Sequence, residues 1–273
     1  MLALMLLVLV FVAMWSTQAL SLRRVGKPIR LRIDHAGLPR KLQRVNRAVT
    51  NAAFAAVLVA YPLLSGVSPL QYYARFFPLD SRIAGLPHGV AAALIYLGLL
   101  YACWLFTDNA YLRSLSDVRR LGVKLAGVPL SAVIGAGIEE LLFRAMLLAG
   151  LLESFVSAFG ARSGTVLAVA VGTLVFAGAH YVRRVKRYWT FPGHLALGML
   201  LCVSFACTGQ ALWLPLGLHA GGILIIMALR PLVRSVGPPW MVGASIYPYA
   251  GAVGVVGLTL LTFNMWLLHG GAP

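Results

Sequence analysis

The sequence predicts an all-α protein, a polytopic membrane bundle of about eight transmembrane helices. Apolar residues make up 60% of the 273 residues and charged residues only 11%, whereas soluble domains carry about 25% charged residues. Apolar stretches of about 18 to 20 residues recur, and this is the length of helix that crosses a bilayer. Because no domain boundary or internal repeat interrupts the pattern, we expect residues 1–273 to form a single integral membrane domain.

Eight spans can be drawn in chain order. Each is an apolar run ended by charged or turn-forming residues. The expected spans are Leu2–Leu20, Ala48–Leu64, Gly89–Phe106, Val128–Leu152, Thr165–Val182, Phe191–Ala206, Ala211–Leu229 and Tyr249–Leu268.

The first span is expected to be a retained anchor rather than a cleaved signal peptide. No cationic segment precedes it, and Arg23 and Arg24 follow it at once. This order of apolar and cationic residues fits a helix inserted with its N-terminus outside the cytoplasm.

The cations support eight spans, because Lys and Arg remain in cytoplasmic connections. Nineteen of the 23 Lys and Arg residues fall after spans one, three, five and seven, and three fall in the other connections. The three are Arg75, Arg82 and Arg162, and Arg144 lies inside span four. This alternation predicts that both termini lie outside the cytoplasm.

The net charge of +16 is explained by a basic face against anionic membrane lipid. The cations are divided among several connections rather than gathered on one folded surface, which argues against a nucleic-acid partner. We therefore expect membrane lipid, and no nucleic acid, to be a partner.

Two of the seven acidic residues, Glu139 and Glu140, are adjacent inside span four. An ionisable side chain in a membrane span costs roughly 2.5 to 3.5 kcal/mol, so such residues usually mark function. Glu140 and Arg144 share a helix face and can pair, whereas Glu139 lies about 100° further around the helix. This geometry predicts Glu140 as a paired carboxylate and Glu139 as a base. The alternative, that these residues only fasten helices together, leaves the second glutamate unexplained.

His180 and His219 each lie in another apolar span. His180 follows Phe176 by one turn, and His219 lies in a stretch that begins at Trp213. A lone histidine in such a stretch is more often a hydrogen-bonded core residue, but carboxylates in a neighbouring span favour a functional role. We expect Glu139, His180 and His219 to converge.

The depths of these residues in the membrane do not agree at first sight. Glu139 lies roughly 17 Å from the start of span four, whereas His180 is only two residues from the expected end of span five. Either span five continues past the membrane surface, or span four begins beyond Pro129.

The ordered motifs resemble those of the CPBP family, which includes type II CAAX prenyl endopeptidases and bacterial intramembrane glutamic proteases. The resemblance covers about residues 128–229, the core motif region, through Glu139-Glu140-x-x-x-Arg144, Phe176-x-x-x-His180 and His219. It implies metal-independent peptide hydrolysis without a cofactor. Glu139 would be the general base on a water, assisted by His180, and His219 would stabilise the oxyanion. Glu140, Arg144 and Phe176 would support them.

One position departs from the family pattern. The family commonly has Asn or Asp four residues after the last histidine, where this chain has Ile223. The loss of one oxyanion donor can lower the rate by about 10² to 10³. Either another group substitutes, with Asn264 of span eight the best candidate, or the chain is slow or inactive.

The sequence thus leaves four functions open. An intramembrane endopeptidase is favoured by the motifs, whereas a bacteriocin-immunity or scaffold protein is favoured by Ile223. A zinc protease would use the same Glu and His residues but lacks HExxH, and a transporter lacks an inverted repeat. For the endopeptidase we expect cleavage of membrane-associated peptides from the cytoplasmic side, with a substrate that is lipid-modified or a C-terminal tail. Compactness and Ala, Leu, Gly and Arg richness favour a multi-pass protein of the bacterial inner membrane.

Overall fold

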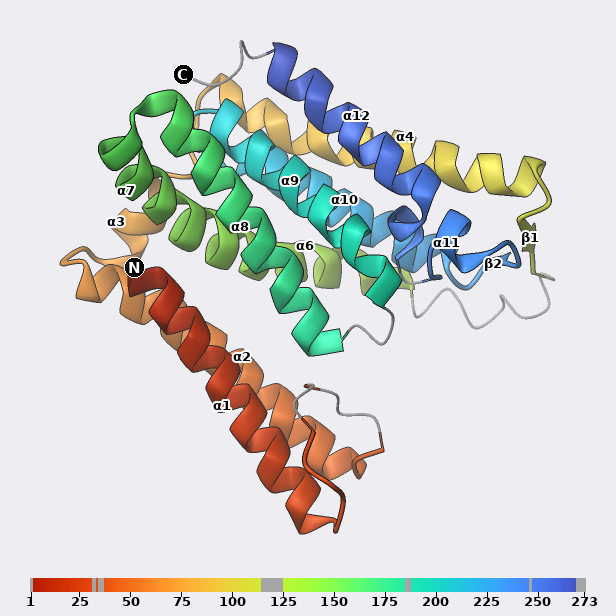
Figure 1. The fold of residues 1–273 in the computed structure, drawn as a ribbon, viewed down its shortest axis with the longest axis horizontal. Coiled ribbons are helices and arrows are strands. Elements are labelled where there is room, and N and C mark those ends of the chain that lie inside the picture. Colours follow the sequence, from red (N-terminus) through yellow and green to blue (C-terminus); the bar gives the residue numbers. More distant parts are fainter. Residues whose placement is uncertain are drawn as a thin grey trace.

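The computed structural model describes residues 2–30, 33, 37–113, 125–184, 188–245 and 247–268 as a helical bundle with two short strands (Figure 1). This confirms the predicted fold class. The first half contains α1 (Leu2–Arg24), α2 (Arg40–Leu64), α3 (Pro69–Ala74), η1 (Ser81–Ala84), α4 (Gly85–Phe106) and β1 (Ala110–Leu112). The middle contains α6 (Val128–Glu140), η3 (Leu141–Leu148), α7 (Ala149–Phe159), α8 (Ala161–Arg184) and η4 (Tyr188–Thr190). The last part contains α9 (Phe191–Cys207), α10 (Trp213–Leu229), β2 (Val233–Ser235), α11 (Pro239–Val242), η5 (Pro248–Ala250) and α12 (Ala252–Leu268).

A helix lies at each of the eight expected spans. Among the described residues, five helical units are long and apolar enough to cross a membrane, one of them the continuous unit α6–η3–α7. The other three, α9, α10 and α12, are apolar helices of 17 residues each. A helix of 17 residues is at the lower limit for a span.

The helices extend beyond several expected boundaries. α2 begins at Arg40, eight residues before the expected Ala48, and its basic first turns continue the helix outside the apolar run. α8 reaches Arg184, past the expected end at Val182, while α6 begins at Val128 as expected. Apolar patterning locates the part of a helix inside hydrocarbon, and the helix itself can continue into the interface.

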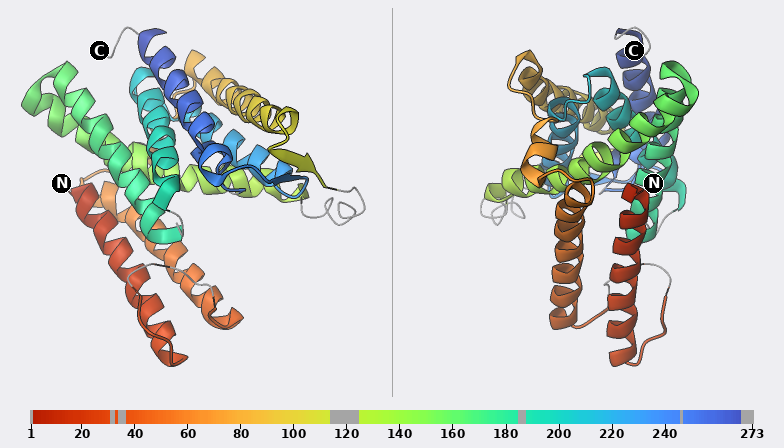
Figure 2. Two further views of the ribbon diagram at one scale, coloured as in Figure 1. Left: turned by 45° about the vertical axis from the view of Figure 1, so that its right-hand side comes forward. Right: turned by 90° about the vertical axis from the view of Figure 1, so that its left-hand side faces the viewer.

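The helices α1 and α2 form a hairpin that projects away from the remaining helices (Figures 1 and 2). A buried hydrogen bond from the Asn46 amide to the Ser21 hydroxyl, 2.8 Å long, joins its two helices. Polar bonds of this kind fasten helices in a membrane, where burial of apolar surface supplies little driving force. Phe11 and Phe54 of the hairpin reach the central cavity.

In the main body, α10 packs along α4 at very short range because both helices present glycine at the contact. A Cβ on Gly89 would lie 2.6 Å from the Leu214 carbonyl oxygen, and a Cβ on Gly221 would lie 2.9 Å from the Val90 Cα. Small residues at such contacts allow membrane helices to approach closely. This contact fixes α10, which carries His219, against α4.

The ends of α4 and α10 are joined by an antiparallel ribbon of β1 and β2, in which Ala110 pairs with Ser235 and Leu112 with Val233. The C-terminal ends of α4 and α10 therefore lie at the same end of the bundle.

Candidate active site

The two adjacent carboxylates lie where the geometry of their helix changes. Glu139 and Glu140 end α6, and the π-helix η3 follows directly. The Arg144 carbonyl accepts from the Ala149 N–H, five residues on, as a π-helix requires. The Tyr72 hydroxyl of α3 donates to the Ala145 carbonyl at 2.8 Å in the buried interior. Short π-segments often occur at functional sites, and here one carries Arg144.

Glu140 is the centre of a buried polar cluster. Its Oε1 lies 2.7 Å from Nδ1 of His219 and 3.3 Å from Nη1 of Arg144. The side chain of Glu140 is 1% exposed and that of Arg144 is fully buried. The expected pair of Glu140 with Arg144 is thus present, and the structure adds His219 of α10 to it. Two donors on one oxygen offset part of the cost of burying this carboxylate, whose Oε2 has no hydrogen-bond partner among the described residues.

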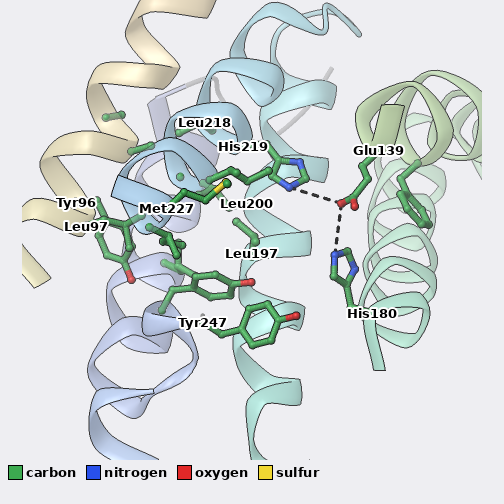
Figure 3. Close-up of a pocket in the computed structure, with 18 of the residues that line it drawn as sticks. Tyr96, Leu97, Glu139, His180, Leu197, Leu200, Leu218, His219, Met227 and Tyr247 are labelled. Carbon is green, nitrogen blue, oxygen red and sulfur yellow. Dashed lines mark ion pairs between the residues drawn. The ribbon is translucent and has the colours of Figure 1, made fainter. Parts of the chain in front are cut away.

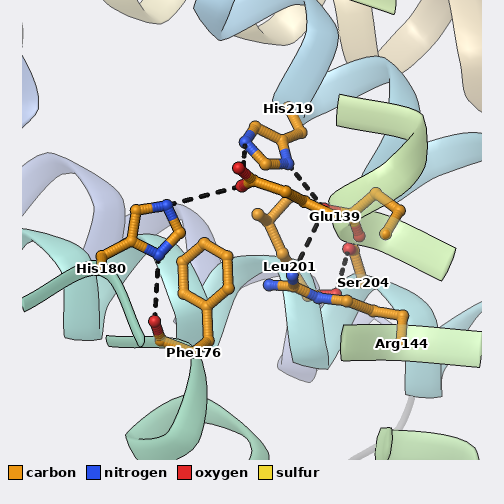
Figure 4. Close-up of polar contacts among 8 residues, drawn as sticks. Glu139, Arg144, Phe176, His180, Leu201, Ser204 and His219 are labelled. Atoms are coloured by element: carbon orange, nitrogen blue, oxygen red, sulfur yellow. Dashed lines mark hydrogen bonds and ion pairs between the residues drawn. The ribbon is translucent and has the colours of Figure 1, made fainter. Parts of the chain in front are cut away.

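Glu139 has different surroundings. Its Oε2 lies 3.4 Å from Nε2 of His180 and 3.7 Å from Nε2 of His219, as Figure 4 shows. The side chain of Glu139 is 25% exposed, against 1% for Glu140. The structure therefore brings Glu139, His180 and His219 together, as the sequence predicts. One carboxylate is buried against two donors, and its neighbour is more exposed and lies beside two imidazole rings.

Hydrogen bonds at Nδ1 orient both histidines. Nδ1 of His180 lies 3.0 Å from the Phe176 carbonyl oxygen, which can only accept, so this nitrogen carries the proton. Nδ1 of His219 likewise donates to the carboxylate of Glu140. With each Nδ1 engaged in this way, each Nε2 is directed at Glu139.

Phe176 connects the two parts of the site. The Arg144 guanidinium carbon lies 4.4 Å from the centre of its ring, a cation–π contact. The ring of His180 lies 4.4 Å from the same ring, centre to centre, and that of His219 lies 6.3 Å away. Phe176 is fully buried. Its ring and its carbonyl oxygen therefore both help to place the histidines.

A cavity of about 530 Å³ opens beside these residues (Figure 3). Glu139, His180 and His219 lie on its wall, and most of the other lining side chains are apolar. Ile223, one turn after His219, is also on the wall. A cavity of this size, mostly apolar with a few polar groups, has the character of a ligand site.

The structure does not bring Asn264 to this site. Asn264 is exposed on α12, whose Leu258 and Leu261 line the cavity. Asn264 is not among the described residues that line it.

One residue near the site was not singled out from the sequence. His194 of α9 is buried, at 1% exposure, with its ring centre 5.2 Å from that of His180. Its position inside an expected span, the same feature that identified His180 and His219, could have indicated it from the sequence.

Within the described part of the chain, no group of three or more His, Cys, Asp or Glu side chains is arranged to hold a metal ion.

Comparison with known proteins identifies the region that carries the site. Residues 121–224 match the family described as type II CAAX prenyl endopeptidase Rce1-like. The match includes Glu139, Glu140, Arg144, His180 and His219. Neither the curated proteins nor the solved structures yield a match. Over residues 121–224 this integral membrane protein is therefore similar to the type II CAAX prenyl endopeptidases, the group within the CPBP family that its motifs resemble.

Proposed function

We propose that this protein is an intramembrane endopeptidase that uses Glu139 to activate water. The observation that carries the proposal is the contrast between the two glutamates. Glu140 is enclosed by Arg144 and His219, whereas Glu139 faces a cavity and two imidazole nitrogens. A partly accessible carboxylate beside histidines has the surroundings that general-base catalysis needs. The family match supports a protease.

In the proposed reaction, the Glu139 carboxylate takes a proton from a water as the water oxygen bonds to the scissile carbonyl carbon. The C–N bond then breaks, and Glu139 returns the proton to the leaving nitrogen. His180 orients the water, because its Nε2 lies 3.4 Å from the Glu139 oxygen. No group is consumed, and the products are a carboxylic acid and an amine.

His219 is proposed to stabilise the oxyanion. Its Nδ1–H is donated to Glu140, so its Nε2 donates to an oxyanion only when the ring carries both protons. The Glu140 carboxylate, 2.7 Å away, stabilises that charged ring. Preorganised donors of this kind supply a large part of the rate enhancement in acyl transfer.

We propose a peptide or protein segment at the membrane as the substrate, either lipid-modified or a C-terminal tail. The apolar wall of the cavity supports a substrate with an apolar segment. Cleavage from the cytoplasmic side of a bacterial inner membrane, without a metal or another cofactor, belongs to the same proposal.

The experiment compares cleavage products in membranes that contain wild-type protein, Glu139→Gln or Glu153→Gln, by mass spectrometry of new peptide termini. Glu153 is exposed on α7 and serves as the matched control. We expect the products with wild type and Glu153→Gln, in the presence of a zinc chelator as well, and not with Glu139→Gln. Products that persist with Glu139→Gln at normal protein levels would contradict the assigned base.

A non-catalytic role as an immunity or scaffold protein is the second candidate, and Ile223 favours it. This side chain places an apolar group on the cavity wall one turn after His219, where the family commonly has an amide or a carboxylate. In that case membranes with wild type and with Glu139→Gln would contain identical peptide termini. Both proteins would also give the same protection against a bacteriocin, or support the same protein assembly.

A further inference from the structure

His194 lies among aromatic rings rather than among polar groups. Its ring centre is 5.2 Å from that of His180, with the two planes tilted by 36°. On the η5 side, its ring centre is 4.7 Å from Tyr247 and 5.9 Å from Tyr249. His194 therefore fills the space between the His180 ring and two tyrosines that line the cavity.

A single hydrogen bond orients the His194 ring and does not link it to the site. Nδ1 lies 2.9 Å from the Thr190 carbonyl oxygen, four residues earlier, in the same arrangement that His180 has with Phe176. Nε2 is buried and has no hydrogen-bond partner among the described residues. What the side chain offers to its neighbours is thus an oriented aromatic ring.

These contacts form part of a continuous row. The row runs from the guanidinium of Arg144 over Phe176, through His180 and His194, to Tyr247. His180 has Phe176 on one side of this sequence of contacts and His194 on the other. Its ring is held by neighbours from two helices as well as by the bond at Nδ1.

The backbone is arranged for this close approach. Gly193 precedes His194, and a Cβ on Gly193 would lie 2.4 Å from Cα of Ala250 in η5. Real Cβ contacts are never so short, so only glycine allows α9 to meet η5 here. The contact brings His194 to the tyrosines beside Ala250.

We propose that His194 is a positioning residue, which holds the His180 ring in the orientation that directs Nε2 at Glu139. The proposal rests on the proposed function for its kinetic consequence. Without the ring at position 194, His180 gains room to turn, and a misplacement of about 1 Å in a catalytic group can lower the rate by about 10²-fold.

The test uses two variants that separate the ring from its donor. His194→Phe keeps an aromatic ring, whereas His194→Asn keeps an N–H near the position of Nδ1 and removes the ring. The substrate is a quenched-fluorescence peptide that spans the main cleavage site found in the membrane comparison. We expect His194→Phe to retain most of the turnover, and His194→Asn to lower kcat by about 10- to 100-fold with KM unchanged.

The control is His88→Asn, since His88 is exposed on α4, and it should leave both constants unchanged. Wild-type kcat in His194→Asn would overturn the proposal. So would the reverse order, in which His194→Asn is active and His194→Phe is not, because it would assign the role to a polar bond.

A second measurement does not depend on hydrolysis and therefore separates failure of this proposal from failure of the proposed function. Melting temperatures in detergent are compared for wild type, His180→Ala, His194→Ala and the double variant. Substitutions of side chains that are in contact have non-additive effects on stability. The melting temperature of the double variant should therefore fall by less than the sum of the decreases in the two single variants. Additive losses would show that the two rings are independent and would overturn the proposal even if the protein is inactive.

Discussion

At the scale of single residues, two neighbouring glutamates have opposite surroundings because they lie on different faces of one helix. The spacing of Glu140 and Arg144 was sufficient to predict their pair. It could not predict that His219 of α10 contacts Glu140 as well as Glu139, because that contact depends on how two distant helices pack. The difference in exposure of the two carboxylates has the same origin.

Arg144→Ala tests this difference. Removal of the guanidinium leaves the buried Glu140 carboxylate without its cationic partner. This should lower the free energy of unfolding by about 3 to 5 kcal/mol and reduce the amount of folded protein. Glu139→Gln, one residue from Glu140 but 25% exposed, should leave the amount unchanged. Both are measured by fluorescence-detected size-exclusion chromatography with heating. Equal losses in the two variants would contradict the division between the carboxylates.

Ile223 tests whether the oxyanion site is incomplete. Ile223→Asn places an amide on the cavity wall one turn from His219, and we expect an increase in kcat of up to about 10²- to 10³-fold. Asn264→Ala is the companion variant, because the sequence suggests Asn264 as a substitute oxyanion donor. Since Asn264 is exposed on α12, we expect this variant to leave kcat unchanged. A large loss with Asn264→Ala would assign it the donor role, and no gain with Ile223→Asn would show that no amide is needed.

At the scale of elements, the helices were predictable and their local geometry was not. The apolar runs located eight helices, but the π-segment over Leu141–Leu148 has no signature in those runs. Its i→i+5 bonding is not encoded by apolar spacing, and the bond from the Tyr72 hydroxyl to the Ala145 carbonyl is a tertiary contact. The interfacial turns of α2 were missed for a different reason, since Arg40, Lys41 and Arg44 are too polar to appear as part of a span.

The contact between α4 and α10 gives a prediction with an internal control. Gly89→Ala would bring Cβ within 2.6 Å of backbone atoms of α10, and overpacking of this kind typically costs about 1 to 3 kcal/mol. Gly98→Ala, on the same helix, would meet nothing within 4 Å and should stabilise the helix slightly. Thermal unfolding in detergent distinguishes them, and equal melting temperatures would show that the contact is not tight.

At the scale of the whole molecule, the distribution of cations predicts how the bundle is oriented in the membrane. Reporter fusions after Arg47, Lys124, Arg187 and Arg234 should indicate the cytoplasm, and fusions after Asp80, Arg162 and Pro273 the other side. The physical basis is the retention of cationic connections in the cytoplasm. A reversal confined to Pro273 would remove the last span and leave the rest of the topology intact.

The sequence therefore predicts most of the architecture and the three residues that converge, because both depend on apolar runs and on the cost of ionisable groups in hydrocarbon. The row of ring contacts through His194 could not be predicted from the sequence. A histidine in an apolar run gives no indication of which rings it meets, and here a close approach at Gly193 decides it.

The short length of α9, α10 and α12 affects the surrounding lipid. At 1.5 Å per residue, 17 residues reach about 26 Å, less than the roughly 30 Å hydrocarbon thickness of a typical bilayer. If these helices span the bilayer, as the sequence predicts, we expect nearby lipid to thin or flanking residues to stretch toward the headgroups, at a cost of a fraction of a kcal/mol per Å. Two of the three helices carry His194 and His219. We therefore expect the acyl chain length of the membrane to influence the part of the protein that holds these histidines, with the highest activity in thin bilayers.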